Sequence, residues 1–379
     1  MKKILLALMA LSMSICAFSQ DYKIPVTNIN RNSYPHILND NRVEFRLRAG
    51  QAVSVKVDIG GKQYDMHRIE DNYWTVITEP QVPGYHYYSL IIDGASVADP
   101  ASRSFYGTSR WASAIEIPEP GMDVFEIQNV PHGQVRELSY FSKVTGSWRP
   151  IRVYTPASYE KGKKKYPVVY IHHGGGEDYR GWIEQGRTNV IMDNLIAAGK
   201  AEEMIVVSVD SNVPSGGGGG YSSQAMSGYR AELIENIIPF IESNFRVKTG
   251  AKNRAMCGLS MGGGQSFQIG LNEPDYFANV ASFSSGMFGG INGTADVDLE
   301  ATVPGILSRT SRFNKQHDVF YLSCGEQDPR IEYTRAAAAK LKDAGVEVYF
   351  NSFPGAHEWQ VWRKSFHEFA QMLFQDKKK

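Results

Sequence analysis

The sequence is poor in three features, and each shortage excludes a class of protein. Only three of the 379 residues are cysteines, and 40 Lys and Arg balance 40 Asp and Glu. Balanced charge provides no electrostatic footprint for nucleic acid or another polyanion, so we expect no such partner. The apolar run from Ile4 to Ile15 is too short to span a bilayer, so we expect no membrane anchor.

The amino terminus has instead the pattern of a secretory signal peptide. Two lysines precede the apolar run, and Ala17-Phe18-Ser19 resembles a cleavage site. We assign residues 1–19 to this peptide and expect an exported protein, either periplasmic or secreted. A lipoprotein signal ending at Cys16 is disfavoured, because Ile15 stands where such signals have a small residue.

After removal of that peptide, Cys257 and Cys324 are the cysteines that remain. Each ends a predicted strand, and we expect both to be small buried hydrophobes without a disulfide, since a domain this large does not need one. The length and a hydrophobic content of 42% predict two domains with a substantial core.

The most informative motif is the G-x-S-x-G pentapeptide Gly258-Leu259-Ser260-Met261-Gly262. It follows a strand-like segment and opens a helix-like one, as a nucleophile elbow does. The serine of such an elbow sits on a strained turn, and the flanking glycines relieve steric crowding. The motif predicts Ser260 as a nucleophile for acyl transfer, although the pattern alone also fits an ordinary glycine-rich turn.

Two later loops hold the partners that such a serine needs, in the order acid and then base. One apolar strand runs into a turn with Asp328, and the next runs into a loop with His357. An imidazole takes the hydroxyl proton, and a carboxylate fixes the imidazole tautomer. We predict Asp328 as the acid and His357 as the base. Glu326 remains an alternative acid, and His367, on a helix-like stretch, is a poorer candidate base.

Upstream of the serine, a hydrophobic strand ends in His172-His173-Gly174-Gly175-Gly176. Backbone must approach a substrate oxygen closely at such a place, which favours glycine. We predict that the amides of Gly175 and Met261 form an oxyanion hole. Because adjacent residues on a strand point to opposite faces, the two histidines do not converge on one ion, and we expect loop scaffolding and no metal site.

Strand-like and helix-like segments alternate through the second part of the chain. Strands are expected at Ile151–Tyr154, Val168–Ile171, Met204–Val209, Arg254–Cys257, Val280–Phe283, Val319–Ser323 and Val346–Phe350, with helices at Tyr229–Asn244 and Thr334–Ala344. This alternation predicts an α/β fold, a mostly parallel sheet with helices on both faces and ligands at the carboxyl ends of its strands. A glycine run at Gly216–Gly220 is expected near the mouth of the cleft.

The first part of the chain has a different texture. Between Asp21 and about Met122, alternating runs such as Val43–Arg48 and Val53–Val57 are separated by turn signals such as Gly60-Gly61. This spacing predicts a small β-sandwich. We assign residues 20–120 to the sandwich and 121–379 to the catalytic domain, with a linker around residues 118–130.

Four motifs in order, the strand ending in HHGGG, GLSMGG, CGEQD and PGAHEWQVWR, resemble the esterase D group and specifically carbohydrate esterase family one. That family includes feruloyl and acetylxylan esterases. The resemblance covers residues from about 124 to about 374 and implies an α/β-hydrolase fold, with Ser260 as nucleophile, Asp328 as acid, His357 as base, and Gly175 and Met261 at the oxyanion hole. No metal or cofactor is needed for this mechanism.

The amino-terminal part resembles the early-set immunoglobulin-like domains related to family 48 carbohydrate-binding modules. Its aromatic residues then have two interpretations, glycan binding or a structural module beside the active site. In the catalytic part, we expect Trp359, Gly176 and Trp182 at the substrate, while Trp362 is a candidate for either the cleft or the core.

The favoured hypothesis is an exported serine esterase that hydrolyses feruloyl esters, and also acetyl esters, on plant xylan, so that its partners are plant cell-wall polysaccharide or oligosaccharide esters. A siderophore trilactone esterase is the second hypothesis, and a cationic pocket would distinguish it. An acyltransferase stays open, because water and an acceptor alcohol compete for the same acyl-enzyme. A glycan-binding protein with a vestigial hydrolase domain is the remaining alternative, against which the complete set of catalytic residues argues.

Overall fold

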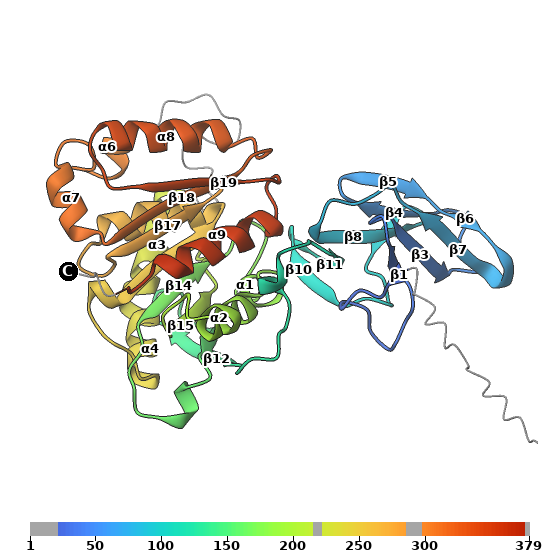
Figure 1. Ribbon diagram of the computed structural model, residues 1–379, viewed down its shortest axis with the longest axis horizontal. Coiled ribbons are helices and arrows are strands. Elements are labelled where there is room, and N and C mark those ends of the chain that lie inside the picture. The colour runs from blue at the N-terminus through green and yellow to red at the C-terminus, as the bar shows by residue number, and fades with distance from the viewer. Residues whose placement is uncertain (1–21, 215–221, 286–297, 376–379) are drawn as a thin grey trace, which may run out of the picture.

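A computed structural model of the protein describes residues 22–214, 222–285 and 298–375. The predicted signal peptide and the glycine run Gly216–Gly220 lie outside these residues. Figure 1 shows two units side by side along the long axis, a β-sandwich built from the first part of the chain and a larger α/β unit built from the rest. In the described ranges, no helix has both the length and the apolar character needed to cross a membrane.

The α/β unit is built on one eight-stranded sheet with the order β12-β13-β15-β14-β16-β17-β18-β19. The first two strands are antiparallel to their neighbours, and β14 to β19 run parallel. The strands are β12 (Gln134–Ser142), β13 (Ser147–Thr155), β14 (Val168–His172), β15 (Ile205–Val209), β16 (Arg254–Leu259), β17 (Asn279–Phe283), β18 (Val319–Gly325) and β19 (Tyr349–Phe353).

Helices cover both faces of this sheet, as the alternation predicts. Strand β14 shows why: Val168 and Tyr170 enter one apolar cluster, whereas Val169 and Ile171 enter the other. The helices are α1 (Gly181–Glu184), α2 (Thr188–Ala197), α3 (Ser223–Ala231), α4 (Ile238–Asn244), α5 (Met261–Gln265), α6 (Leu299–Thr302), α7 (Thr310–Gln316), α8 (Ile331–Asp343) and α9 (Trp359–Met372). A π-helical segment, Glu232–Ile237, joins α3 to α4, so the predicted helix at 229–244 is one part of a longer rod.

Two strands depart from the sequence predictions. The last one is β19, three residues later than the predicted Val346–Phe350, because Val346 and Val348 are buried in the turn after α8, where the Val346 N–H donates to Leu341. Strand β12 was not predicted, since it is an edge strand and most of its side chains face solvent. An apolar run therefore marks burial here more reliably than it marks the strand itself.

The two described cysteines agree with the prediction. Cys257 and Cys324 are free and buried. They lie on β16 and β18, and β17 separates these strands. Both side chains therefore act as small hydrophobes in the sheet.

Two antiparallel sheets form the sandwich, with the strand orders β1-β2-β3-β7-β6 and β10-β11-β8-β4-β5, and β9 pairs with β8. Alternation in β4 buries every second residue, as predicted. Phe45, Val57, Trp74 and Tyr88 lie in the core between the sheets. The strands are β1 (Tyr22–Lys23), β2 (His36–Leu38), β3 (Val43–Arg48), β4 (Val55–Ile59), β5 (Lys62–Asp65), β6 (His67–Arg68), β7 (Tyr73–Ile77), β8 (Gly84–Ile92), β9 (Ala95–Val97), β10 (Ser104–Gly107) and β11 (Arg110–Ile117).

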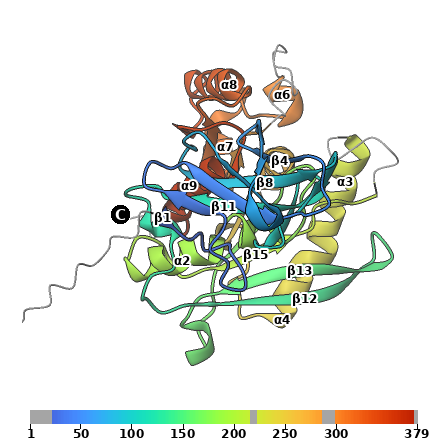
Figure 2. The same ribbon diagram turned by 90° about the vertical axis from the view of Figure 1, so that its right-hand side faces the viewer.

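The sandwich packs closely against the α/β unit. Figure 2 views the molecule with the sandwich toward the viewer. Arg363 of α9 is buried and forms a two-pronged ion pair with Glu116 of β11, at 3.0 and 2.7 Å. The segment after β11 is also fixed, because Asn194 of α2 donates to two of its carbonyls, at Val124 and Glu126. The predicted linker is thus packed onto the catalytic unit.

Candidate active site

Ser260 occupies a strained turn between β16 and α5. Its φ of 50° and ψ of −113° lie in a region that L-residues rarely adopt. A Cβ on Gly258 would lie 2.7 Å from the carbonyl oxygen of His172, and one on Gly262 would lie 2.5 Å from that of His173. Both motif glycines are therefore required by close backbone packing. The turn leaves Ser260 half-buried at the carboxyl end of β16.

Asp328 and His357 are brought together from the loops after β18 and β19. His357 Nδ1 lies 2.7 Å from Asp328 Oδ2. The Asp328 carboxylate is fully buried, and its other oxygen accepts from the N–H of Arg330 over 3.0 Å and from its guanidinium over 3.1 Å. Burial raises the pKa of Asp328, but the bond to His357 and the donors of Arg330 outweigh it, so the pKa lies below its usual value. A carboxylate is thereby maintained against the imidazole.

The two alternative residues are placed elsewhere. Glu326 is exposed, and its N–H bonds to the carbonyl of Phe353. His367 lies on α9 against Phe125, and burial lowers its pKa. The carboxylate that faces His357 is that of Asp328.

Ser260 and His357 line one pocket of about 320 Å³. The pocket is lined from both units of the molecule, with the α/β unit providing the loops around the serine and histidine. Its lining residues are Gly60, Gly61, Tyr85, His86, Tyr87, Thr108, Gly174, Gly175, Glu177, Leu259, Ser260, His357, Glu358, Trp359 and Trp362. The reacting side chains therefore come from the α/β unit, and both units shape the pocket.

The glycine loop after β14 has three distinct environments. Gly175 lines the pocket, and a Cβ there would meet nothing within 4 Å, so the space beside it is open. A Cβ on Gly174 would lie 2.5 Å from Leu259. Gly176 was expected at the substrate, but it faces the sandwich: its φ is +76°, and its carbonyl accepts the N–H of Ser109 over 2.7 Å. Gly176 therefore joins the domains and does not line the pocket.

Met261 begins α5, directly after the serine. The first N–H groups of a helix have no partner within the helix, so the Met261 amide belongs to this group. Gly175 lines the pocket, whereas Met261 is buried and is not among the lining residues, so the pair of oxyanion donors stays a prediction.

The three tryptophans of the site form one packed set. Trp359 lines the pocket, and its ring meets that of Trp182 edge to face at 5.3 Å. Trp182 was expected at the substrate, but it is fully buried behind Trp359, and its indole N–H donates to the His172 carbonyl over 2.7 Å. Trp362 is buried and also lines the pocket, with its ring 5.0 Å from that of His357.

The adjacent histidines both lie behind the loop. His172 Nδ1 bonds to the Cys257 carbonyl over 2.8 Å, and burial lowers the pKa of His172 to about 3. Burial also acts on His173, but the carboxylate of Asp210, 3.3 Å from its Nε2, raises the pKa above its usual value. Among the residues that the structure describes, no group of three or more His, Cys, Asp or Glu side chains is placed to hold a metal ion.

Several lining residues were not predicted from the sequence, and the contacts of two of them, Glu177 and Tyr87, are informative. Glu177 directly follows the glycine loop; its burial raises the pKa of its carboxyl to about 7. Tyr87 comes from β8, where its hydroxyl accepts from Gln185 over 2.9 Å and from Trp359 over 3.3 Å. Tyr85 and Tyr87 share a face of β8, because alternate strand residues do, and that pairing was the one available signal.

Comparison with known proteins gives a family for this arrangement. Residues 142–373 match the model of the Esterase family, described as "Putative esterase". The chain belongs to this esterase family. The esterase is also 34% identical over 354 residues to an endo-1,4-beta-xylanase/feruloyl esterase of Xylanibacter ruminicola. This match covers 90% of the present chain and 46% of that relative, so the chain spans about half the relative's length.

Solved structures agree on the fold of the esterase. A carbohydrate esterase family one ferulic acid esterase from Anaeromyces mucronatus, in complex with ferulic acid, is 28% identical with a TM-score of 0.57, covering 68% of this chain and 96% of that one. The enterobactin esterase of Shigella flexneri, at 18% identity, has a TM-score of 0.64 and covers 88% of this chain and 94% of its own. The α/β-hydrolase prediction is thereby confirmed, as is the resemblance to carbohydrate esterase family one.

Proposed function

We propose that this protein is a serine esterase that hydrolyses hydroxycinnamoyl esters, feruloyl esters above all, on plant cell-wall polysaccharide or oligosaccharide. The main support for this proposal is the geometry of three residues. Ser260, on its strained turn, lines the same pocket as His357, and His357 Nδ1 lies 2.7 Å from Oδ2 of the buried Asp328. This set provides a nucleophile, a base and an orienting carboxylate in the roles that acyl transfer requires.

The reaction follows from these roles. His357 takes the proton of the Ser260 hydroxyl through Nε2, since Nδ1 faces Asp328. The serine oxygen bonds to the ester carbon, and the carbonyl electron pair moves to oxygen, where the amides of Gly175 and Met261 stabilise it. The bond to the alcohol then breaks, and His357 returns its proton to the leaving oxygen. Water repeats the sequence on the acyl-enzyme and releases the acid.

The pocket supports an aromatic acyl group. Trp359, Trp362, Tyr85 and Tyr87 supply aromatic walls, and a volume of about 320 Å³ lies within the range of small-molecule sites. The Xylanibacter relative carries a feruloyl esterase name, and the Anaeromyces structure holds ferulic acid. Acetyl esters remain part of the proposal as smaller substrates that enter the same pocket.

A siderophore esterase is the second candidate, because the enterobactin esterase has the same fold across both domains. A ferric catecholate is anionic and calls for cationic side chains. The described lining residues include no lysine or arginine, and Glu177 and Glu358 contribute carboxyl groups. The lining therefore favours a neutral acyl group.

We also propose that the protein is exported, on the basis of the sequence pattern of residues 1–19. Location of the protein in cell fractions, with amino-terminal sequencing of the mature chain, tests this. A mature chain that begins at Met1 would overturn the proposal.

Release of ferulate and of acetate from arabinoxylan tests the function, with Ser260→Ala as control. Ferulate released by the wild type and not by the variant supports the proposal. Acetate alone would move the assignment to deacetylation. Release of neither, with hydrolysis of a trilactone siderophore, would favour the second candidate, and transfer of ferulate to an added alcohol in preference to water would indicate an acyltransferase.

A further inference from the structure

Two consecutive peptide groups in the glycine loop are held by hydrogen bonds, the first at both its N–H and its carbonyl and the second at its carbonyl. The first joins His173 to Gly174: its N–H donates to Glu177 Oε2 over 3.2 Å, and its carbonyl accepts from the Gly262 N–H over 3.1 Å. The second joins Gly174 to Gly175: its carbonyl accepts from His173 Nδ1 over 2.8 Å and from the Glu177 N–H over 3.3 Å. Since the N–H and C=O of a trans peptide point in opposite directions, these bonds turn the Gly175 N–H away from His173.

This second peptide needs external support. It lies between two glycines, whose backbones rotate more freely than those of other residues. Glycine is nevertheless required at Gly174, where a Cβ would lie 2.5 Å from Leu259. Rotation of the peptide would direct the Gly174 carbonyl, in place of the Gly175 N–H, at a substrate oxygen. Bonds from neighbouring side chains must then supply the order that the glycines cannot.

We propose that Glu177 and His173 are positioning residues that hold the two peptides on either side of Gly174, so that the Gly175 N–H points toward the pocket and the oxyanion hole stays formed. Both side chains are buried, and each bonds directly to the loop. This inference rests on the proposed function, because it concerns the oxyanion formed by attack of Ser260. It assigns a role to a carboxyl group that the proton transfers do not use.

The surroundings fix the two side chains in turn. His173 Nε2 lies 3.3 Å from Asp210 Oδ1 and 3.1 Å from the Ser211 N–H. Arg149 lies 3.8 Å from the other oxygen of Asp210. Behind the loop, therefore, a buried network of charged groups holds the imidazole that in turn holds the peptide.

The titratable groups facing Glu177 are His173, Asp178 and Tyr87. Burial raises the pKa of Glu177 to about 7, and Asp178 adds to this, whereas His173 and the Gly174 N–H oppose it. Below that pH the carboxyl group is neutral, and its oxygen accepts the loop N–H without placing a negative charge beside the oxyanion. Above it, the charge repels the developing oxyanion.

Two substitutions at Glu177 separate positioning from other roles. Glu177→Leu removes the acceptor with little change in volume, and Glu177→Gln keeps an oxygen that can accept the Gly174 N–H. With an aryl ferulate as substrate, we expect kcat of the leucine variant to fall about 10- to 100-fold, below the loss of a whole oxyanion donor, with KM within about threefold. The glutamine variant should keep kcat within about threefold at pH 6, and its kcat should fall less than that of the wild type above pH 7.

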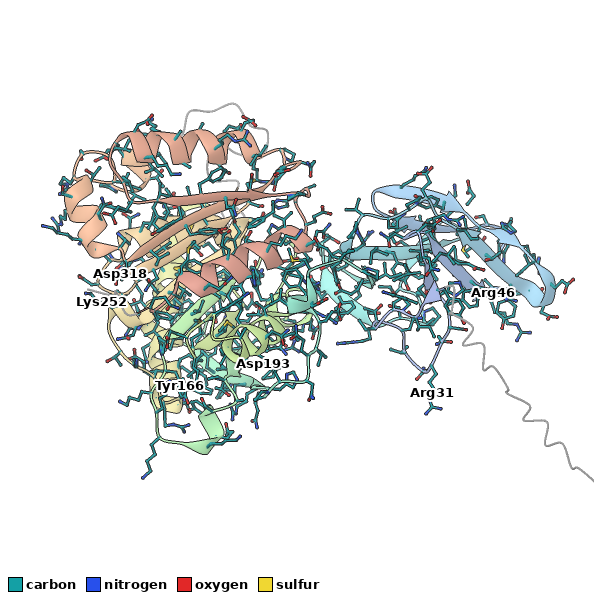
Figure 3. All side chains as sticks on the ribbon, viewed as in Figure 1. Arg31, Arg46, Tyr166, Asp193, Lys252 and Asp318 are labelled. Carbon is teal, nitrogen blue, oxygen red and sulfur yellow. The ribbon has the colours of Figure 1, made fainter. Side chains whose placement is uncertain are left out.

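His173→Leu tests the second support. It should lower kcat by a similar factor, and the double variant should lose less than the product of the two, because the two side chains hold adjacent peptides of one loop. Asp193→Asn is the matched control. Asp193 is also buried and accepts a backbone N–H, from Gly133 over 2.8 Å, but it lies on α2 outside the pocket (Figure 3). We expect this variant to lose stability and to keep its kcat.

The outcomes separate the positioning role from the proposed function. Unchanged kcat in folded Glu177→Leu would overturn the positioning role, and so would a rise in KM alone, which would make Glu177 a substrate contact. Equal losses in Glu177→Leu and Asp193→Asn would also overturn it, by indicating general destabilisation. A wild type that hydrolyses no ester, and whose Ser260 is not labelled by a fluorophosphonate, would overturn both proposals together.

Discussion

The two walls of the pocket come from different kinds of structural element. The α/β wall presents Ser260, His357 and Gly175 from loops at the carboxyl ends of parallel strands. The sandwich wall presents Tyr85 and Tyr87 from the beginning of a long antiparallel strand. Residues of the first wall lie in motifs because their backbone geometry is unusual, whereas those of the second are ordinary strand residues. The reacting groups thus lie in motifs, whereas the sandwich contributes lining residues that no motif marks.

Contacts between the walls show that the sandwich completes the site. The Tyr87 hydroxyl accepts from Trp359 and Gln185 of the α/β unit, and Arg363 is neutralised by Glu116 of the sandwich. Loss of the Glu116 carboxylate alone would leave a buried guanidinium without its partner, which costs far more than loss of a surface ion pair. Of the two interpretations of this domain, the contacts support a structural module beside the active site.

The largest loss of kcat is expected from a substitution of Ser260. If the α/β wall carries the chemistry, Ser260→Ala should lower kcat for an aryl ferulate by about 10⁴- to 10⁶-fold, because the acyl-enzyme can no longer form. Its thermal unfolding should match that of the wild type, since a single oxygen is removed. Residual activity within tenfold of the wild type would show that another residue is the nucleophile.

Asp328→Asn comes next, with an expected loss of about 10³- to 10⁴-fold in kcat. An amide opposite His357 favours the wrong imidazole tautomer and no longer stabilises the imidazolium. Glu326→Gln is the control, since Glu326 is exposed in the same turn and faces no histidine. The measurement is kcat across pH. A larger loss in the control than in Asp328→Asn would exchange their roles.

Tyr87→Phe tests whether the sandwich wall of the pocket contacts the substrate. It removes the Tyr87 acceptor of the Trp359 N–H and one of the two acceptors of the Gln185 amide, which still donates to the Tyr106 carbonyl, and this costs about 1–3 kcal/mol of stability. Because Trp359 lines the pocket, KM for the aryl ferulate should rise about three- to tenfold while kcat stays within about twofold. Tyr64→Phe, in the same domain but outside the pocket, should leave KM unchanged. Equal KM values in both variants would show that this wall does not contact substrate.

The smallest effect is a pH dependence of stability carried by Glu177. Its pKa of about 7 in the folded protein lies above the ordinary value of 4.5, so the native state holds a proton that the unfolded state releases between these pH values. Its contribution to stability is complete below pH 4.5 and is lost as pH rises through 7. Glutamine does not ionise, so relative to the wild type, Glu177→Gln should gain up to about 3 kcal/mol across this window.

Urea unfolding of both proteins between pH 5 and pH 8 measures that gain. A constant difference across the range would show that the carboxyl is ionised throughout, as on an exposed surface. Activity at the same pH values, in the same buffers, separates the stability effect from the effect on kcat.

Sequence reasoning succeeded where backbone geometry restricts residue choice. There is no room for a side chain at Gly258 or Gly262, and Ser260 has a strained backbone. This turn therefore requires particular residues and can be recognised as a sequence pattern. The parallel sheet was predicted for a related reason, since β14 to β18 are buried on both faces and appear as continuous apolar runs.

It failed where a residue's role depends on what another part of the chain brings to it. Gly176 and Trp182 were expected at the substrate, but a hairpin of the sandwich covers the first and the ring of Trp359 covers the second. Glu177 carries no motif of its own, and its burial is a product of tertiary packing. The roles of such residues can be predicted only when the contacts between distant segments are known, and spacing along the chain does not reveal those contacts.

Helix α9 gives the molecule a mechanical constraint. Its first turn begins at Trp359, two residues after His357, and one turn later Arg363 is tied to the sandwich. Helix α9 is short and rigid. A movement of the sandwich relative to the α/β unit would therefore shift Arg363, and with it the loop that positions His357. On the proposed function, we therefore expect the two domains to stay together during turnover and a polysaccharide to present its ester at the existing mouth of the pocket.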